Sequence, residues 1–173
     1  KLIQRALHST KSVNTNFKIL PEDVIIKVYS NAHIPENYIN SENLRLSTYK
    51  DFLSTSSEKD LNMFINNIVD RFGPLPYSFL NLTHECRLKI LCSKAGFSSI
   101  IKQGCGFLLN HAFSGADNNM SSLIDFIDDF FSKQDVKFHF IPKQNLSFCI
   151  HFNQRSDKHL LLSDFLNKFI LLN

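Results

Sequence analysis

Apolar residues in the first half of the chain recur at the spacing of helix faces. The clearest helix runs from Ser57 to Gly73, where positions i, i+3, i+4, i+7 and i+11 form one hydrophobic stripe of Leu61, Phe64, Ile65, Ile68 and Phe72. Ser57 and Asp60 form a weak capping box at its start. Gly73 occupies the place of a left-handed C-terminal residue, and Pro74 ends the helix just beyond it.

Two further helices flank this one. The pattern predicts a helix over residues 76–96, with Pro76 at a favourable first helical position. It also predicts a helix over residues 41–53, whose apolar face is formed by Leu46, Tyr49 and Leu53. Because the links between the three helices are short, we expect them to form a compact antiparallel cluster.

The second half of the chain mixes strands and helices. Runs of β-branched and apolar residues predict short strands at residues 99–102 and 107–111, and a similar run at 24–29 predicts one more. Helical periodicity predicts amphipathic helices over residues 119–132 and 156–171. The apolar faces of these two helices comprise Met120, Leu123, Ile124, Ile127 and Phe131 in the first and Leu161, Leu162, Phe165, Leu166 and Phe169 in the second.

A hairpin is predicted between those two helices. Its two arms alternate apolar and polar positions, with an apolar set of Val136, Phe138, Phe140, Leu146, Phe148, Ile150 and Phe152. If all of these residues share one buried face, Phe140 lies opposite Phe148. In the same register Phe138 lies opposite Ile150, and a three-residue loop over residues 143–145 joins the arms.

The order of these elements predicts an α+β fold, an antiparallel helical cluster packed with a small, mostly antiparallel sheet. Hydrophobic residues make up 43% of the 173 residues and include 17 Phe, which is enough for a substantial core. The chain begins inside a helical pattern with Lys1 rather than Met. We therefore interpret residues 1–16 as the end of a helix and a linker from an upstream domain, and residues 17–173 as the domain itself.

Composition narrows the classes of function. The net charge of +3 comes from scattered Lys and Arg, which predicts a solvated surface rather than a nucleic-acid-binding face. No apolar run approaches the length that crosses a bilayer, and we expect no membrane contact. None of the four cysteines forms a CxxC pair, and a chain with this much core needs no disulfides, so we expect a reducing, cytoplasmic location.

Catalytic chemistry finds little support in the sequence. The segment 104–106, Gly-Cys-Gly, is too short for a phosphate-binding loop, and no GK[ST] follows it. Cys86 and Cys92 lie on the apolar side of a predicted helix, so we interpret them as small core residues rather than nucleophiles. We predict no catalytic residue and no cofactor in this chain.

The predicted hairpin contains three candidate metal ligands. His139, Cys149 and His151 share the hairpin face opposite the phenylalanines, where three soft ligands can converge. A structural zinc site normally uses four ligands and no fourth is evident nearby, so we predict no metal site. Acidic residues on the polar side of the helix at 119–132 predict a solvated face, formed by Asp125, Asp128 and Asp129.

One polar patch differs from an ordinary surface. At 100° per residue along the helix at 57–73, Asn67, Asp70 and Arg71 fall together on the side away from the core. Met63 joins the same side. An exposed Met beside an Asp–Arg pair is typical of a protein interface, with a plain solvated surface as the alternative.

Three segments around this patch resemble a known family. They are HIPENYI at residues 33–39, NLRL and YK within residues 43–50, and VDRFGPLP at residues 69–76. In order and spacing they are similar to the "IP-acid-x-YI", "LRLxxYK" and "DRFGPLP" segments of the C-terminal domain of bacterial transcription-repair coupling factors. The resemblance covers about residues 33–96, and residues beyond 97 match only in general layout.

The resemblance implies a function for the parent protein and for this domain. The parent is expected to be an ATP-driven translocase on duplex DNA, with ATP and magnesium in an upstream motor, that pushes stalled RNA polymerase and recruits UvrA. The domain is expected to dock on the N-terminal UvrB-like module and mask the UvrA-binding surface. Asp70 and Arg71 match two docking residues of the family, whereas Asn67 stands where the family has Glu.

Two other classes of function remain open at this point. One is an accessory module that contacts nucleic acid or RNA polymerase, which the slight positive charge favours; phosphate contacts would give a steep salt dependence of DNA affinity. The other is an enzyme that uses a Cys–His pair, which thiol alkylation during a hydrolase assay would test.

Overall fold

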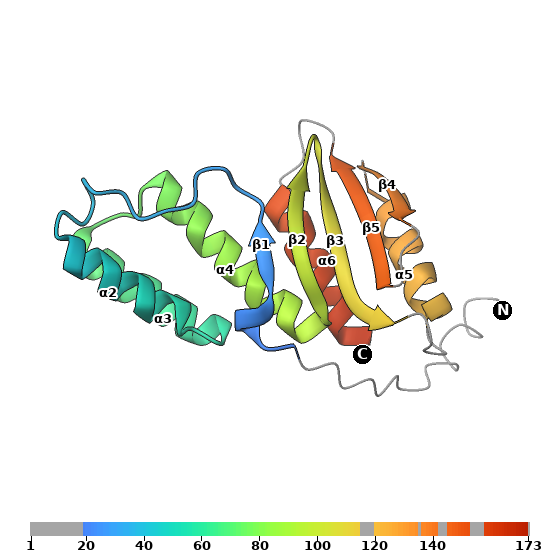
Figure 1. Cartoon of the computed structure of the whole chain (residues 1–173), viewed down its shortest axis with the longest axis horizontal. Coiled ribbons are helices and arrows are strands. Elements are labelled where there is room, and N and C mark those ends of the chain that lie inside the picture. Colours follow the sequence, from blue (N-terminus) through green and yellow to red (C-terminus); the bar gives the residue numbers. More distant parts are fainter. Residues whose placement is uncertain (1–18, 115–119, 135, 142–144, 153–157, 173) are drawn as a thin grey trace.

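The computed structural model describes residues 19–114, 120–134, 136–141, 145–152 and 158–172. Its centre is a five-stranded sheet in the order β1-β2-β3-β5-β4 (Figure 1). The short strand β1 pairs parallel to β2, and all other neighbours are antiparallel. The strands are β1 (Ile25–Lys27), β2 (Phe97–Gln103), β3 (Gly106–Ser114), β4 (Val136–Ile141) and β5 (Asn145–Phe152).

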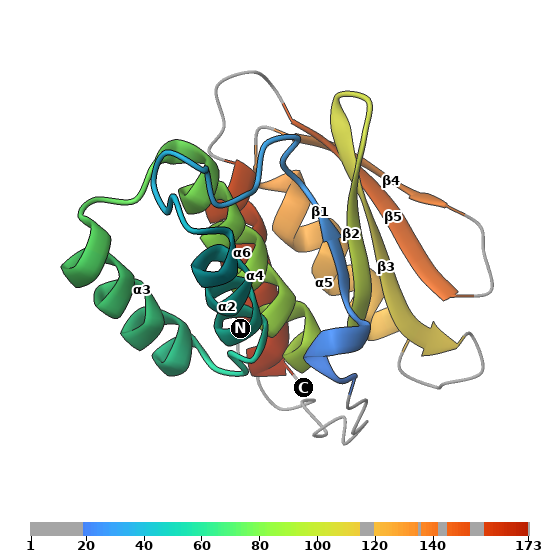
Figure 2. The same cartoon turned by 60° about the vertical axis from the view of Figure 1, so that its left-hand side comes forward.

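Within the described residues, five α-helices and one 3-10 turn accompany the sheet. Helices α4, α5 and α6 lie on one face of the sheet, while α2 and α3 extend to the side and complete a helical cluster with α4 (Figures 1 and 2). This arrangement confirms the predicted α+β class. The elements are η1 (Pro21–Asp23), α2 (Glu42–Leu53), α3 (Glu58–Phe72), α4 (Tyr77–Ala95), α5 (Met120–Ser132) and α6 (Lys158–Leu172).

Aromatic side chains fill the space between the sheet and its helices. Phe97 of β2 is fully buried, and its ring centroid lies 5.8 Å from Phe165 and 5.1 Å from Phe169 of α6. The predicted hairpin register is confirmed, because Phe140 pairs with Phe148 and Phe138 with Ile150. Alternating apolar side chains on the helix-covered face of the sheet therefore produce this core, as the sequence pattern requires, and on β5 the intervening Ser147 and Cys149 are buried as well.

Helix α4 belongs to three hydrophobic clusters at once. Its first turns contribute Phe79 to a cluster with Ile34, Ile39 and Ile68. Its middle contributes Cys86 and Ile90 to a second cluster with residues of α2 and α3. Its last turns join the main core against the sheet, through Leu88, Leu91, Cys92 and Ala95.

The predicted ends of α3 are largely confirmed. The Ser57 hydroxyl accepts a hydrogen bond from the Asp60 amide at 3.1 Å and donates one to the Asp60 carboxylate at 2.7 Å. Gly73 caps the other end with φ 84° and ψ −169°, so its φ is positive but its conformation is not left-handed helical. Pro76 is the N-cap of α4 rather than its first residue, and Gly96 ends α4 in a left-handed conformation.

The predicted apolar face of α2 is wrong. Leu46 is 53% exposed and Leu53 is 70% exposed, whereas Thr48 and Phe52 are buried. The Thr48 hydroxyl donates to the Leu44 carbonyl at 2.7 Å, and this hydrogen bond lets a polar residue face the core. Because α2 has apolar residues on several sides, periodicity alone did not identify the packed face.

The strand predicted at residues 24–29 is shorter in the structure. Residues 21–23 form η1 and only Ile25–Lys27 pair with β2. The next two amides, of Val28 and Tyr29, donate to one carboxylate oxygen of Glu85 at 2.9 Å each. A side chain of α4 therefore replaces the sheet partner and ends the strand.

Some expectations fall outside the described residues. The helix end and linker at residues 1–16 do so, as do residues 143 and 144 of the predicted hairpin loop. Asn145 begins strand β5 instead of completing that loop. Among the helices that the structure describes, none combines the length and apolar character of a membrane span.

Candidate protein-docking surface

Helix α3 lies at the outer edge of the helical cluster, away from the sheet (Figure 2). Its apolar stripe faces inward, with Leu61 and Ile68 buried. Met63, Asn67 and Asp70 are all exposed on the opposite side, as their helical spacing predicts. Arg71 is exposed beside them. We call Met63, Asn67, Asp70 and Arg71 the α3 patch.

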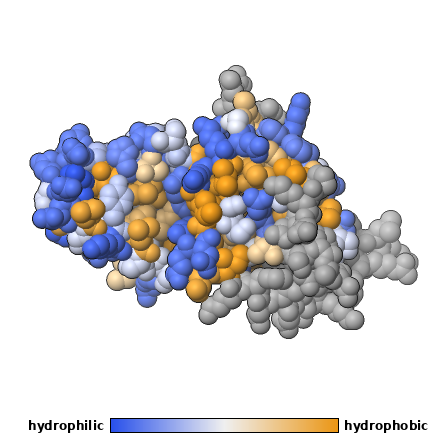
Figure 3. All heavy atoms as spheres, in the orientation of Figure 1, coloured by the Kyte–Doolittle hydropathy of each residue, from blue (hydrophilic) through white to orange (hydrophobic). Residues whose placement is uncertain are grey.

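The charged groups of the α3 patch are open to a partner. Across the part of the chain that the structure describes, the Asp70 carboxylate makes no ion pair or side-chain hydrogen bond. The Arg71 guanidinium lies 5.1 Å from the ring centroid of Phe72, a distance at which a cation is attracted to the ring face. Figure 3 shows mainly hydrophilic residues with isolated apolar ones over this end of the molecule.

A network of hydrogen bonds holds the C-terminal end of α3 in place. The Tyr38 hydroxyl donates to the Gly73 carbonyl at 2.6 Å, directly after the helix. Four residues before Tyr38, the Ile34 amide donates a hydrogen bond to the Tyr49 hydroxyl at 2.7 Å. The Arg45 guanidinium donates to the Ile39 carbonyl at 2.8 Å and pairs with Glu36 at 3.3 Å.

These bonds join the three segments on which the sequence resemblance rests. Residues 33–39 contact α2 through Tyr49 and Arg45, and they contact the end of α3 through Tyr38. Most residues of these motifs therefore act as a framework that fixes the direction of α3. Asp70 and Arg71 are different, because they belong to the motif but point away from the framework.

Comparison with known proteins identifies the family of the chain. The family model of the TRCF domain matches residues 28–122, which covers both the framework and the α3 patch. The chain belongs to the TRCF domain family. The predicted resemblance to the C-terminal domain of transcription-repair coupling factors is thus confirmed.

Full-length relatives of this TRCF domain are much longer. The transcription-repair-coupling factor of Mycobacterium bovis is 34% identical over 80 residues, which is 46% of this chain and 6% of that protein. The same factor of Rickettsia typhi is 25% identical over 134 residues, or 78% of this chain and 12% of that protein. The chain therefore spans only a small fraction of the relatives that it matches.

A solved structure shares the fold of this TRCF domain. A crystal structure described as the C-terminal domain of transcription-repair coupling factor superimposes with a TM-score of 0.68 at 14% identity. The match covers 86% of this chain and 92% of that one. Because the match covers 86% of the chain, the shared fold extends beyond residue 122, where the family model ends.

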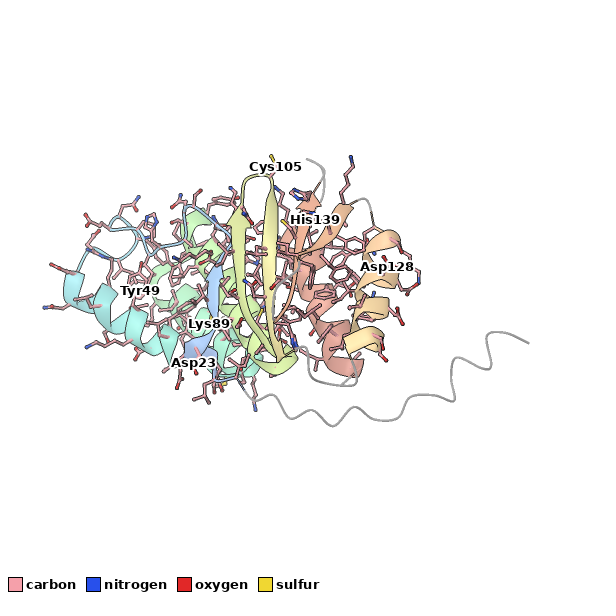
Figure 4. All side chains as sticks on the ribbon, turned by 45° about the vertical axis from the view of Figure 1, so that its right-hand side comes forward. Asp23, Tyr49, Lys89, Cys105, Asp128 and His139 are labelled. Carbon is pink, nitrogen blue, oxygen red and sulfur yellow. The ribbon has the colours of Figure 1, made fainter. Side chains whose placement is uncertain are left out.

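The other candidate residues of this TRCF domain divide into two groups. Cys86 and Cys92 are buried, and burial raises the pKa of both thiols, which fits core residues rather than nucleophiles. The acidic side chains of α5 are exposed, as predicted, and Figure 4 shows Asp128 on the outer side of that helix. By contrast, His139, Cys149 and His151 converge, with ligand atoms within 4.8 Å of one another.

The structure also contains an apolar hollow that the sequence did not indicate. It lies between η1 and β1 on one side and the C-terminal end of α2 and the middle of α4 on the other. Its formation depends on long-range packing, so no local motif signals it. The walls include Val24, Phe52, Leu53, Cys86 and Ile90.

Proposed function

We propose that this TRCF domain is a protein-docking module that inhibits its parent protein in cis. Its role is to bind the N-terminal UvrB-like module of the same chain and to mask the surface that recruits UvrA. The exposed α3 patch carries this proposal, because its Asp–Arg pair lies on the outer face of α3 and matches the docking residues that the sequence resemblance implies. The parent acts in transcription-repair coupling, as its named relatives do.

The physical basis is a two-state equilibrium. Docking through the α3 patch lowers the free energy of the closed state, and a partner opens it only by binding the open state more tightly. A coupling of about 1–3 kcal/mol is sufficient for useful regulation. RNA polymerase engagement supplies that difference in this scheme, while ATP hydrolysis and duplex DNA binding belong to the upstream motor.

Asn67 modifies the strength of the docked state. A Glu at this position would add a third charge to the patch, whereas Asn supplies only amide hydrogen bonds. Losing one partner of a desolvated charged contact typically costs about 2–5 kcal/mol. With Asn67 in place we expect the lower end of this range. The loss of the contact that Asp70 and Arg71 make with the UvrB-like module should therefore cost about 2 kcal/mol.

The test uses the full-length parent protein with Asp70→Ala and Arg71→Ala combined. A loss of about 2 kcal/mol shifts the closed-to-open equilibrium about 30-fold toward open, because about 1.4 kcal/mol corresponds to a factor of ten. UvrA affinity and DNA-stimulated ATPase should both rise toward the values of a protein that lacks residues 17–173.

The matched control is Asp129→Ala with Lys133→Ala. This pair is also charge-neutral and exposed, its Nζ and Oδ2 atoms are 2.6 Å apart, and it lies at the C-terminal end of α5 and in the turn after it, at the far end of the molecule (Figure 1). The control should behave as wild type. If deletion raises UvrA affinity but the Asp70/Arg71 variant does not, the α3 patch is not the docking surface. If deletion itself has no effect, the domain is not inhibitory, and a contact with polymerase or DNA becomes the better explanation.

A further inference from the structure

Three potential metal ligands meet on the open face of the sheet. Strands β4 and β5 pair so that His139 lies directly opposite Cys149, while His151 follows two residues later on the same face of β5. Residues opposite one another in an antiparallel pair have Cβ atoms about 4.5–5.5 Å apart, and diagonal neighbours are within reach of long side chains. The register thus places two imidazoles around one thiol, on the face opposite the aromatic core.

The distances are close to those that a single ion requires. The ligand atoms of the three side chains all lie within 4.8 Å of one another. Around tetrahedral zinc, bond lengths of about 2.0–2.3 Å place the ligand atoms about 3.3–3.6 Å apart. The His139 and His151 rings stack with centroids 5.4 Å apart and planes 13° from parallel, so an ion is bound only after these side chains rotate to bring their nitrogens closer.

A glycine on the neighbouring strand leaves room for one of these ligands. Gly106 of β3 pairs with His151, and a Cβ at this position would lie 2.9 Å from the His151 Nδ1 atom and would also clash with the Ile150 carbonyl. Only glycine therefore allows the His151 ring to lie at this place on the sheet. Figure 4 shows His139 toward the end of the sheet at which the β2–β3 turn carries Cys105.

We infer that His139, Cys149 and His151 form a binding site for a soft divalent transition metal, with Zn²⁺ as the preferred ion. Imidazole nitrogen and thiolate sulfur are the ligands that zinc favours over the oxygen ligands of magnesium or calcium. Structural zinc sites use four protein ligands, but sites with three protein ligands and one water or exogenous ligand are equally well established. His139 is exposed, so water can reach an ion bound to its ring.

Binding exchanges a proton for the metal. The Cys149 thiol loses its proton to the buffer as the zinc–sulfur bond forms, and each imidazole binds as the neutral ring. Two features of the site oppose each other. Burial raises the pKa of the Cys149 thiol, which disfavours the thiolate in the absence of an ion. A hydrogen bond with the Ile150 backbone acts in the opposite direction and favours the thiolate.

The site is separate from the proposed docking surface. It lies on the β4–β5 pair, whereas the α3 patch lies on the other side of the molecule beyond α4 (Figure 1). Metal binding can therefore fail while docking is intact, and docking can fail while metal binding is intact.

Cobalt is the probe for this site, because tetrahedral Co²⁺ with a thiolate ligand gives sulfur-to-metal charge-transfer absorption that histidine-only binding does not. The domain is titrated with Co²⁺ under reducing conditions, and bound Co²⁺ is then displaced with Zn²⁺. We expect one equivalent, a charge-transfer band, and loss of that band on zinc addition. Zinc should also raise the midpoint of thermal unfolding, because an ion that binds only the folded state stabilises it.

Variants assign the ligands. Cys149→Ser should abolish the charge-transfer band, and His139→Ala should weaken binding at least about tenfold, the scale on which even supporting residues of metal sites act. His139 is exposed, so its variant tests the site even if replacement of the buried Cys149 impairs folding. The control is His33→Gln, because His33 is an exposed histidine in the segment before α2, far from the β4–β5 pair. This variant should bind Co²⁺ with the wild-type affinity.

Three results would overturn the inference. The first is the absence of a charge-transfer band in the wild-type domain. The second is an unchanged band in a folded Cys149→Ser variant. The third is an equal loss of affinity in the His33 and His139 variants, which indicates adventitious binding to surface histidines.

Discussion

The buried His111 makes stability depend on pH. This side chain of β3 is 3% exposed, and its Nε2 atom lies 2.9 Å from the Ala95 carbonyl. Phe97 meets the ring edge-on at 4.8 Å between centroids. Burial among apolar groups disfavours the charged imidazolium and lowers the pKa of His111 to about 4, although the bond to Ala95 acts in the opposite direction.

The sign and size of the effect follow from this pKa. Between pH 6.5 and about 4 the unfolded chain binds a proton at His111 and the folded chain does not, so stability falls as the pH falls through this window. The free energy of unfolding falls by up to about 1.4 kcal/mol for each pH unit, and by about 3 kcal/mol over the whole window. Above pH 6.5 the contribution is fully present.

Urea unfolding of wild type and His111→Gln at several pH values between 4 and 7 measures this contribution. The variant should be less stable at pH 7, but its free energy of unfolding should fall less steeply, with a slope smaller by up to about 1.4 kcal/mol per pH unit. Partial burial and the nearby His159 and Arg87 also lower the pKa of His84, so only the difference between the two proteins is informative. Equal slopes in the two proteins would refute the assignment, as would a His111 pKa near 6.5 by NMR.

Two further predictions concern local structure. Ser57→Ala removes the hydroxyl that accepts from the Asp60 amide, so urea unfolding should show a loss of about 1 kcal/mol, with Ser56→Ala as a control close to wild type. Glu85→Ala leaves the Val28 and Tyr29 amides without the carboxylate to which both donate, and should cost about 1–3 kcal/mol. Hydrogen exchange should then accelerate at these two amides first, and uniform acceleration across the chain would argue against a local cause.

The sequence predicted most accurately the elements whose packed face is set by local pattern. Helix α3 carries one unbroken apolar stripe between a Ser cap and Gly73, so both its length and its inward face followed from the residues. The hairpin register followed in the same way, because a slip by one residue would have exposed Phe138 and Phe140. The exposed side of α3 is the complement of its stripe, so the sequence alone predicts where the α3 patch lies on the helix.

Features set by distant residues were not predictable in this way. Strand β1 ends where Glu85, 57 residues from Val28, takes over its amides. The inward face of α2 depends on its position beside α3 and α4, not on its own periodicity. The convergence of His139, Cys149 and His151 followed from the hairpin register, but the space for His151 depends on Gly106 of a third strand.

The position of α4 determines which substitutions can separate binding from folding. This helix packs against the sheet through residues such as Cys92 and against α2 and α3 through residues such as Phe79 and Ile90. A substitution that shortens a buried side chain of α4 leaves a cavity and therefore weakens the main core and the helical cluster together. A loss of docking in such a variant would say nothing about the docking surface. Asp70 and Arg71 are exposed and belong to none of the three clusters, and substitutions at such surface positions usually change stability by about 0.5 kcal/mol or less. A change in UvrA binding in the Asp70/Arg71 variant would thus report on contact with a partner, provided that the unfolding midpoint of the domain stays at its wild-type value.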